Sequence, residues 1–212
     1  MNPTLAGITV PDTALVGDAT DLVRAATDDL LFDHSSRVFY FGALQGQVRG
    51  LEVDLELLYV GALFHDLGLT SAFATDDKRF EVDGADGARR FLLDHGRPAA
   101  DATTVWTAIA LHTTPGVPEF LDPVIALVTA GVETDVLGIG YHDLPADAID
   151  AVVAAHPRID FKNRILQAFT TGNLHRPETT FGNVNADVLA RFDPSFQRTD
   201  FVDVINDSPW PR

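Results

Sequence analysis

The sequence predicts an all-α fold, a compact bundle of helices, and three observations support this prediction. Apolar residues recur at intervals of three and four in almost every periodic segment, as they do on one face of a helix. Leu30, Leu31, Val38 and Phe41, for example, share such a face. No stretch alternates apolar and polar residues for long, as a half-buried strand would. Hydrophobic residues make up 46% of the 212 residues, which is enough for a sizeable core.

The chain divides into three parts along its length. Residues 1–17 are expected to be an irregular lead-in, because Pro3 and Pro11 interrupt them. Residues 18–175 carry the helical periodicity and form the predicted helical domain. Residues 176–212 hold several Pro and Gly residues, and we expect them to wrap the same domain as coil, with a short helix over 185–192.

The helices are predicted in order from their start and stop signals. The first runs from Asp18 or Thr20 to Gln47, with a break near Asp28 or Asp33. Asp54 caps the second, which stops at Gly68. Pro123 lies in the first turn of a later helix, as proline often does. The other expected helices are 83–96 with Asp83 as its cap, 101–114 opened by Asp101, 121–138, 145–157 and the first half of 161–177.

Composition restricts the partners and the ligands of the protein. No cysteine is present, so His, Asp and Glu remain as metal ligands. The formal net charge is −16, from 15 Lys+Arg against 31 Asp+Glu, and such a surface repels nucleic acid and anionic membranes. There is no apolar run of 18 residues, and residues 1–12 lack the features of a signal peptide. We therefore expect a cytoplasmic protein that acts on a small molecule, with no nucleic-acid or membrane partner.

Five polar residues interrupt the apolar faces that should point inward. They are His34, the adjacent pair His65 and Asp66, His112 and Asp135. A lone inward histidine is more often a hydrogen-bonded core residue than a ligand. An inward aspartate is more often a cap or an ion-pair partner, but Asp135 lies near a helix C-terminus, where carboxylates are disfavoured. Two histidines and two aspartates on three separate faces favour one divalent metal, which His34, His65, Asp66 and Asp135 would share.

The order H…HD…D, carried by these four residues, resembles the HD-domain superfamily of metal-dependent helical enzymes. Longer segments are similar to one branch, cyanamide hydratase and its bacterial relatives: "DHSSRVFYFG", "FHDLGLT", "RFEVDGADGARRFL", "VWTAIALHTTPG", "VTAGVETDVLG", "RPETTFGNVNADVLARF" and "NDSPW". The resemblance implies an all-α HD-domain bundle and a single zinc-like metal held by His34, His65, Asp66 and Asp135. It also implies hydration of a small nitrile, with urea as the product from cyanamide. Fe, Mn and Ni also suit His/Asp sites.

A metal-bound hydroxide would attack the nitrile carbon, and the nitrogen must then gain a proton. His112 is the expected residue to move that proton, because it follows an apolar helix and should point inward. Asp66 would accept a proton while it binds the metal. The expected substrate contacts are Thr113, Thr114, Arg79 and Glu81.

Three alternatives stay open at the level of sequence. A phosphohydrolase of a nucleotide or small monoester would need bases near the metal; the candidates are Arg37, Arg79, Arg89 and Lys78. A dinuclear oxygenase would need inward histidines in addition to His112. A binding module without turnover would close the metal off with protein ligands. Self-association into a homo-oligomer also stays open.

Overall fold

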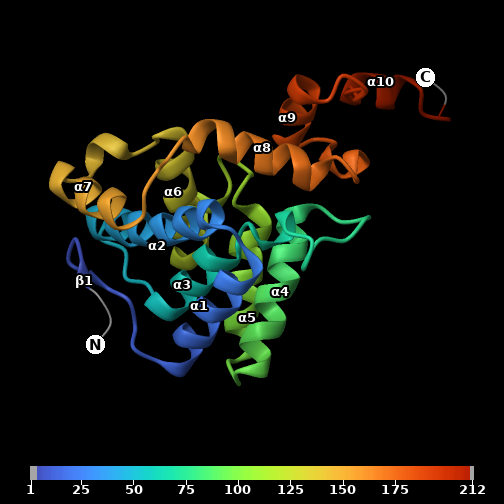
Figure 1. The fold of residues 1–212 in the computed structure, drawn as a ribbon. Coiled ribbons are helices and arrows are strands. Elements are labelled where there is room, and N and C mark those ends of the chain that lie inside the picture. Colours follow the sequence, from blue (N-terminus) through green and yellow to red (C-terminus); the bar gives the residue numbers. More distant parts are fainter. Residues whose placement is uncertain (1–3, 211–212) are drawn as a thin grey trace.

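Within residues 4–210, which the computed structural model describes, the chain forms ten α-helices and one short β-hairpin, so the all-α prediction is confirmed (Figure 1). The hairpin pairs β1 (Thr4–Leu5) with β2 (Ile8–Thr9) in antiparallel fashion. The helices are α1 (Ala14–Ala26), α2 (Asp29–Arg49), α3 (Leu55–Phe64), α4 (Phe80–Asp94), α5 (Ala99–Leu111), α6 (Pro123–Val132), α7 (Ala146–Ala155), α8 (Phe161–Asn173), α9 (Asn185–Phe192) and α10 (Phe201–Asn206). Shorter turns are the 3₁₀ segments η1 (Leu67–Leu69), η2 (Pro118–Phe120), η4 (Tyr141–Asp143) and η5 (Pro177–Thr180), and the π-helical segment η3 (Glu133–Leu137).

The helix starts follow side-chain capping. Thr13, Asp28 and Asp54 each accept a hydrogen bond from a backbone N–H in the first turn of α1, α2 and α3, which satisfies donors that have no partner within the helix. The cap at Thr13 begins α1 earlier than the sequence predicted. The residues expected to form an irregular lead-in therefore include the hairpin and the first turn of α1.

Asp83 was predicted to cap α4, and that prediction is wrong. The helix begins at Phe80, so Asp83 lies inside its first turn and is buried. Its carboxylate accepts hydrogen bonds from the backbone N–H and the hydroxyl of Thr75 and from the guanidinium of Arg176. Asp83 therefore joins α4 to the preceding loop and to the C-terminal segment.

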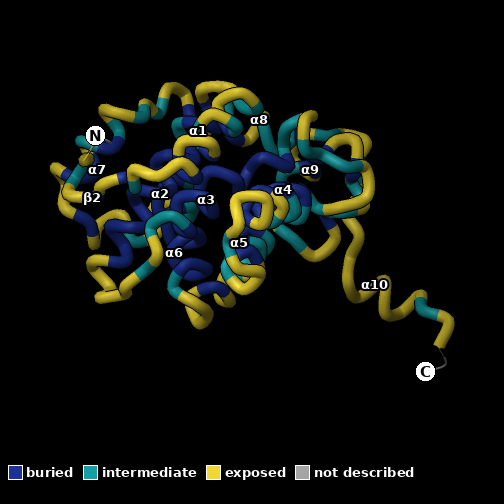
Figure 2. Tube along the Cα trace, turned by 90° about the horizontal axis from the view of Figure 1, so that it is seen from below, coloured by how far each residue is buried: buried dark blue, intermediate teal, exposed yellow. Residues whose placement is uncertain are grey.

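Helix α2 runs through the middle of the bundle, where most of its residues are buried (Figure 2). It packs closely against α6 because glycines face each other across the contact. A Cβ on Gly131 would lie 2.2 Å from the carbonyl oxygen of Val38, and one on Gly42 would lie 2.6 Å from that of Leu127. This close approach brings His34 of α2 next to Asp135, which lies in η3 directly after α6.

A second close contact places the start of α4 beside the His65–Asp66 pair. A Cβ on Gly68 would lie 1.9 Å from the carbonyl oxygen of Phe80, so only glycine fits there. Because Gly68 and Asp66 belong to the same turn after α3, the first turn of α4, with Glu81, lies close to the pair.

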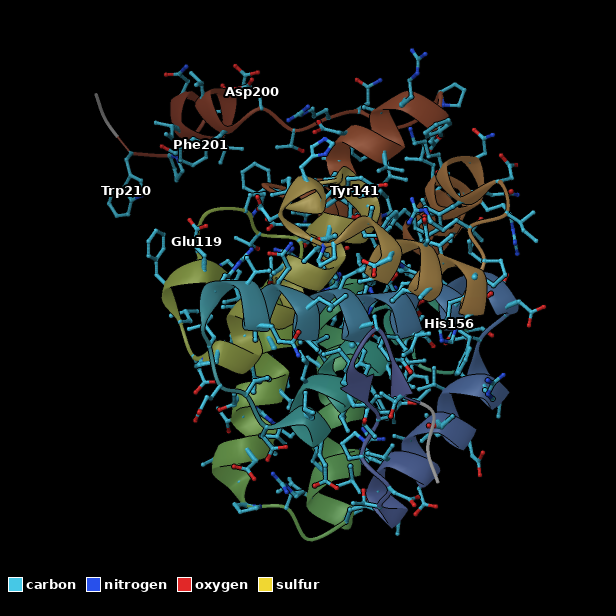
Figure 3. The ribbon with its side chains drawn as sticks, turned by 90° about the vertical axis from the view of Figure 1, so that its left-hand side faces the viewer. Glu119, Tyr141, His156, Asp200, Phe201 and Trp210 are labelled. Carbon is cyan, nitrogen blue, oxygen red and sulfur yellow. The ribbon has the colours of Figure 1, made fainter. Side chains whose placement is uncertain are left out.

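The C-terminal segment packs on the body as far as α9, and α10 has no buried residue. Figure 3 shows Asp200, Phe201 and Trp210 on a stretch that leads away from the helical body. Arg176, by contrast, is completely buried and contacts the loop before α4. Across the described residues, each helix is either too short or too polar to cross a membrane.

Candidate metal centre

Four elements bring the predicted polar residues to one place in the core. His34 lies in α2, His65 and Asp66 follow α3, and His112 follows α5. Asp135 lies in the π-helical turn after α6, a geometry that is frequent at functional sites. None of the five side chains belongs to a residue more than 3% exposed. The helical periodicity therefore identified residues that do point inward.

His34, His65 and Asp66 form a compact cluster. Nε2 of His34 lies 3.1 Å from Nε2 of His65, and Oδ2 of Asp66 lies 3.5 Å and 3.3 Å from these two nitrogens. One ligand atom from each of the three residues lies within 4.8 Å of the others. His112 approaches the other carboxylate oxygen, with its Nε2 3.7 Å from Oδ1 of Asp66.

The hydrogen bonds of the three imidazoles fix which ring nitrogen carries the proton. Nδ1 of His65 lies 2.7 Å from the carbonyl oxygen of Ala62, and Nδ1 of His112 lies 2.7 Å from that of Ile109. A carbonyl oxygen only accepts, so both nitrogens donate. Nδ1 of His34 donates in the same way to the carboxylate of Asp135, at 2.7 Å. When the rings are neutral, each Nε2 therefore carries no proton and has a lone pair, and all three lone pairs face Asp66.

This arrangement of acceptors fits a cation. Both carboxylate oxygens of Asp66 are buried, and neither has a hydrogen-bond donor within the described residues. A buried charge without a partner is costly, so such a site is expected to bind a metal. Two bare nitrogens only 3.1 Å apart repel each other unless a positive charge lies between them. Imidazole and carboxylate are the ligands that zinc and related divalent metals take.

The pKa shifts agree with the need for positive charge. Burial lowers the pKa of His34, and it lowers the pKa of His112 to about 4, further helped by His65. Burial also acts to lower the pKa of His65, but the Asp66 carboxylate outweighs it, so this pKa ends above the usual range. Burial alone would raise the pKa of Asp66, yet the surrounding histidines hold it well below its usual range. The Asp66 carboxylate therefore favours positive charge beside it, either as a second proton on His65 or as a metal ion with the rings neutral.

Asp135 lies behind His34 rather than among the three clustered residues. Nε and Nη2 of Arg37 donate to its two oxygens at 2.8 Å and 2.9 Å, and Arg158 also donates to it. With His34 Nδ1 as a further donor, the carboxylate is fully satisfied within the chain. The sequence predicted direct ligation by Asp135, and this stays a prediction. In this structure the carboxylate lies on Nδ1 of His34, the position from which carboxylates orient metal-binding histidines.

Arg37 is the residue of this arrangement whose role the sequence did not reveal. It lies three residues after His34 on the same helix face and is completely buried. That spacing was a usable signal, because a buried arginine needs a carboxylate and Asp135 is an inward one. Arg37 also donates to the carbonyl oxygens of His156 and Pro157, so its donors are used within the protein.

The predicted substrate residues Arg79, Glu81 and Thr113 lie together beside His112. Glu81 is completely buried, and it accepts hydrogen bonds from Arg79 at 2.9 Å and from the hydroxyl of Thr113. Burial opposes ionisation of Glu81, but Arg79 and the nearby His112 outweigh it, so its pKa is lowered. An ionised carboxylate therefore lies next to the histidine that faces Asp66.

Thr113 and Thr114 line a cavity of about 870 Å³. Its other walls come from the C-terminal segment, around η5 and the start of α9 and on to Val202. Because Thr113 also contacts Glu81, the cavity borders the network that leads to His112. Thr113 and Thr114 line the cavity, whereas the cluster residues and His112 do not.

Comparison with known proteins identifies the family. The HD-domain model matches residues 31–154, more than half of the chain, and these include His34, His65, Asp66, His112 and Asp135. The chain belongs to the HD-domain family. HD domains are in general metal-dependent hydrolases, and His34, His65 and Asp66 of this one form a group that can hold a metal ion. A search of curated proteins finds no match to the chain.

Proposed function

We propose that this HD domain is a metal-dependent hydratase that adds water to a small nitrile, with cyanamide as substrate and urea as product. One observation carries the proposal: Asp66 presents Oδ2 to His34 and His65, and presents Oδ1 to His112. In this proposal Oδ2 faces the two histidines that bind the metal, and Oδ1 faces the histidine that transfers the proton. The sequence motifs similar to cyanamide hydratase support the choice of reaction.

The proposed metal ligands are His34, His65 and Asp66, with Asp135 holding His34 in orientation. Zinc suits these donors best, and Fe, Mn and Ni suit them as well. When bound, such an ion supplies Lewis acidity and lowers the pKa of water. Three protein ligands leave a position for a small molecule, which favours an enzyme over a closed metal site in a binding module.

His112 is the proposed proton carrier. Its pKa of about 4 keeps the ring neutral at neutral pH, and its Nδ1 is engaged by Ile109, so Nε2 is free to accept a proton. In the reaction a C–O bond forms to water, one C–N π bond breaks, and the nitrile nitrogen gains the proton that the water loses, which gives the isourea form. The remaining hydroxyl proton then moves from oxygen to that nitrogen, and urea results. His112 takes that proton from the water and delivers it to the nitrogen. Asp66 Oδ1, which faces His112, is the second acceptor.

The substrate is proposed to be small and uncharged, with Arg79, Glu81, Thr113 and Thr114 on its side of the cluster. Arg37 is fully engaged by Asp135, Lys78 pairs with Asp86 at 2.8 Å, and Arg89 stacks on Trp106. Among the bases considered for a phosphate, only Arg79 lies near His112, and Glu81 already holds it. Family membership nevertheless favours a phosphohydrolase as the second candidate, so both reactions need to be measured.

The test compares two substrates and two variants. The zinc-loaded protein is expected to release urea from cyanamide and to leave nucleoside monophosphates intact. His112→Ala should keep the metal and the melting temperature and lose turnover roughly 10²–10⁴-fold, as expected for a general acid–base residue. His95→Ala is the control, because His95 pairs with Asp18 at the surface. Phosphate release without urea would instead establish the phosphohydrolase, and full activity of His112→Ala would remove His112 from the mechanism.

A further inference from the structure

Asn185 is a buried amide with one unused acceptor. It is the first residue of α9 and is only 2% exposed. Its Nδ2 donates to Oε1 of Glu81 at 3.2 Å, while its Oδ1 is buried and has no donor. Turning the amide over would bring Oδ1 against the Glu81 carboxylate, where two acceptors repel each other. The carboxylate therefore fixes the amide with Oδ1 directed away from it.

The position of Asn185 links the cavity to the cluster. Asn183, Val184 and Ala186, its immediate neighbours, line the cavity, as does Thr113. On the other side its amide contacts Glu81, whose charge lies close enough to His112 to affect it. The backbone N–H of Asn185 donates to the side chain of Asn183 at 3.0 Å, which further holds the residue in place. Asn185 does not itself line the cavity, so its unpaired oxygen lies in the buried layer between the lining residues on either side of it in the chain and Glu81.

We infer that Asn185 Oδ1, held by Glu81, is a subsite that accepts a hydrogen bond from an N–H group of the substrate. This inference rests on the proposed hydratase and narrows its substrate class. The site would select nitriles that carry an amino group on the nitrile carbon over alkyl nitriles of the same size. A buried acceptor without a donor is costly, and a ligand N–H removes that cost while a methyl group does not. Asn185 also lies beyond residues 31–154, outside the match to the family model.

Cyanamide and acetonitrile form a matched pair of probes, because they differ by an amino group in place of a methyl group. Asn185→Leu keeps a side chain of similar shape without the acceptor. Loss of the contact with Glu81 should affect both substrates alike, whereas loss of the acceptor affects cyanamide alone. The ratio of kcat/KM for cyanamide to that for acetonitrile should therefore fall by roughly 5- to 150-fold in this variant, the effect of leaving a buried donor unpaired. Each kcat/KM of the variant is divided by the value of the unmodified protein with the same nitrile, so the difference in intrinsic reactivity between the two nitriles cancels.

Asn173→Leu is the matched control for structural damage. Asn173 is 1% exposed, and its Nδ2 donates to the carbonyl oxygen of Phe169 within α8. This variant loses a buried amide of the same kind, so it should lower the melting temperature without changing the preference for cyanamide over acetonitrile. An equal fall with both probes in Asn185→Leu would overturn the subsite and make Asn185 a structural residue.

Binding to the unmodified protein separates this inference from the proposed function. In an NMR titration of the zinc-loaded protein, cyanamide should bind more tightly than acetonitrile. If cyanamide binds with this preference but is not hydrated, the proposed function fails and the subsite stands. If cyanamide is hydrated but the two nitriles bind equally well, the function stands and the subsite is overturned. Because this measurement uses no variant, it decides the question even if Asn185→Leu fails to fold.

Discussion

The core contains two groups of buried charge that differ in how they are satisfied. In the His34–His65–Asp66 cluster, the carboxylate of Asp66 has no hydrogen-bond donor in the described chain. At the junction of the C-terminal segment, Arg176 is equally buried, but it donates to Asp83 and to four backbone carbonyl oxygens. These carbonyls belong to Gly68, Thr75, Lys78 and Gly172.

The difference teaches that burial of charge does not by itself identify a functional site. The Arg176 junction is complete within the chain, and it fastens the C-terminal segment to the loop before α4. The cluster leaves both oxygens of Asp66 without a donor in the described chain, and we propose that a cation supplies the missing positive charge. Asp135 illustrates the rule within a few ångströms of the cluster, because it is as buried as Asp66 but has four donors from Arg37, Arg158 and His34. We therefore propose that Asp66 binds the metal and that Asp135 orients His34.

The largest expected effect on stability comes from breaking the Arg176–Asp83 junction, whose charges are satisfied within the chain. Arg176→Met leaves Asp83 as an unpaired buried charge and should lower the free energy of unfolding by about 3–5 kcal/mol. The loss should be the same with zinc and with a chelator, since the junction uses no metal. Urea unfolding in both conditions measures it. Arg198→Met, which breaks an exposed pair with Asp187, is the control and should change little.

If Arg176→Met lowered the free energy of unfolding less than Arg198→Met, the ion pair of Arg176 with Asp83 would not be what stabilises the attachment of the C-terminal segment. A loss that disappeared in the presence of chelator would show that Arg176 acts through the metal cluster instead.

Removal of the metal tests the His34–His65–Asp66 cluster. Free zinc at 100 times its dissociation constant should stabilise the protein by about 2.7 kcal/mol over the chelated form. In His65→Ala the ligand set is broken, so the melting temperature should no longer respond to zinc. Calorimetry with and without zinc measures both. An unchanged response in His65→Ala would show that His65 is not a ligand.

The smallest effect on stability and metal binding is expected from Asp135, which contacts the proposed ligand His34 on the side away from the metal. Asp135→Asn keeps the size of the side chain but weakens its hold on His34, and zinc should bind about 10- to 100-fold more weakly while one ion per chain is retained. Competition with a zinc-binding dye measures the change. Asp33→Asn is the control, because Asp33 pairs with His156 and not with the cluster. Complete loss of zinc in Asp135→Asn would make Asp135 a ligand itself.

Sequence reasoning recovered the residues whose placement depends on helical periodicity. His34, His65, Asp66 and His112 point inward because each lies on or directly after an apolar helix face, which the sequence displays. The α-helical architecture followed from the same pattern. The cap Asp54 was predicted, and Asp28 caps α2 at one of the two positions where a break was expected. Asp101, predicted to open a helix, lies instead inside the first turn of α5, which begins at Ala99.

What the sequence did not reveal depends on contacts between distant segments. Asp83 looked like a cap until Arg176, 93 residues later, was seen to pair with it. Asp135 was predicted to be a ligand, and its pairing with Arg37, 98 residues away, could not be seen from the sequence. Asn185 lies in a segment that reads as coil with a short helix, and only its contact with Glu81 shows its chemistry. Pairing of this kind is set by packing, here by the close contacts of Gly131 and Gly68, and single-sequence patterns do not encode it.

A crystal structure of the zinc-loaded protein, with anomalous data at the zinc edge, tests the central claim most directly. We expect one ion bound at about 2.0–2.2 Å by His34 Nε2, His65 Nε2 and an oxygen of Asp66. Asp135 should remain on Nδ1 of His34, and His112 should lie outside the ligand set. An ion bonded to Asp135, or no ion between the two histidines, would contradict the assignment of the His34–His65–Asp66 cluster as the metal site.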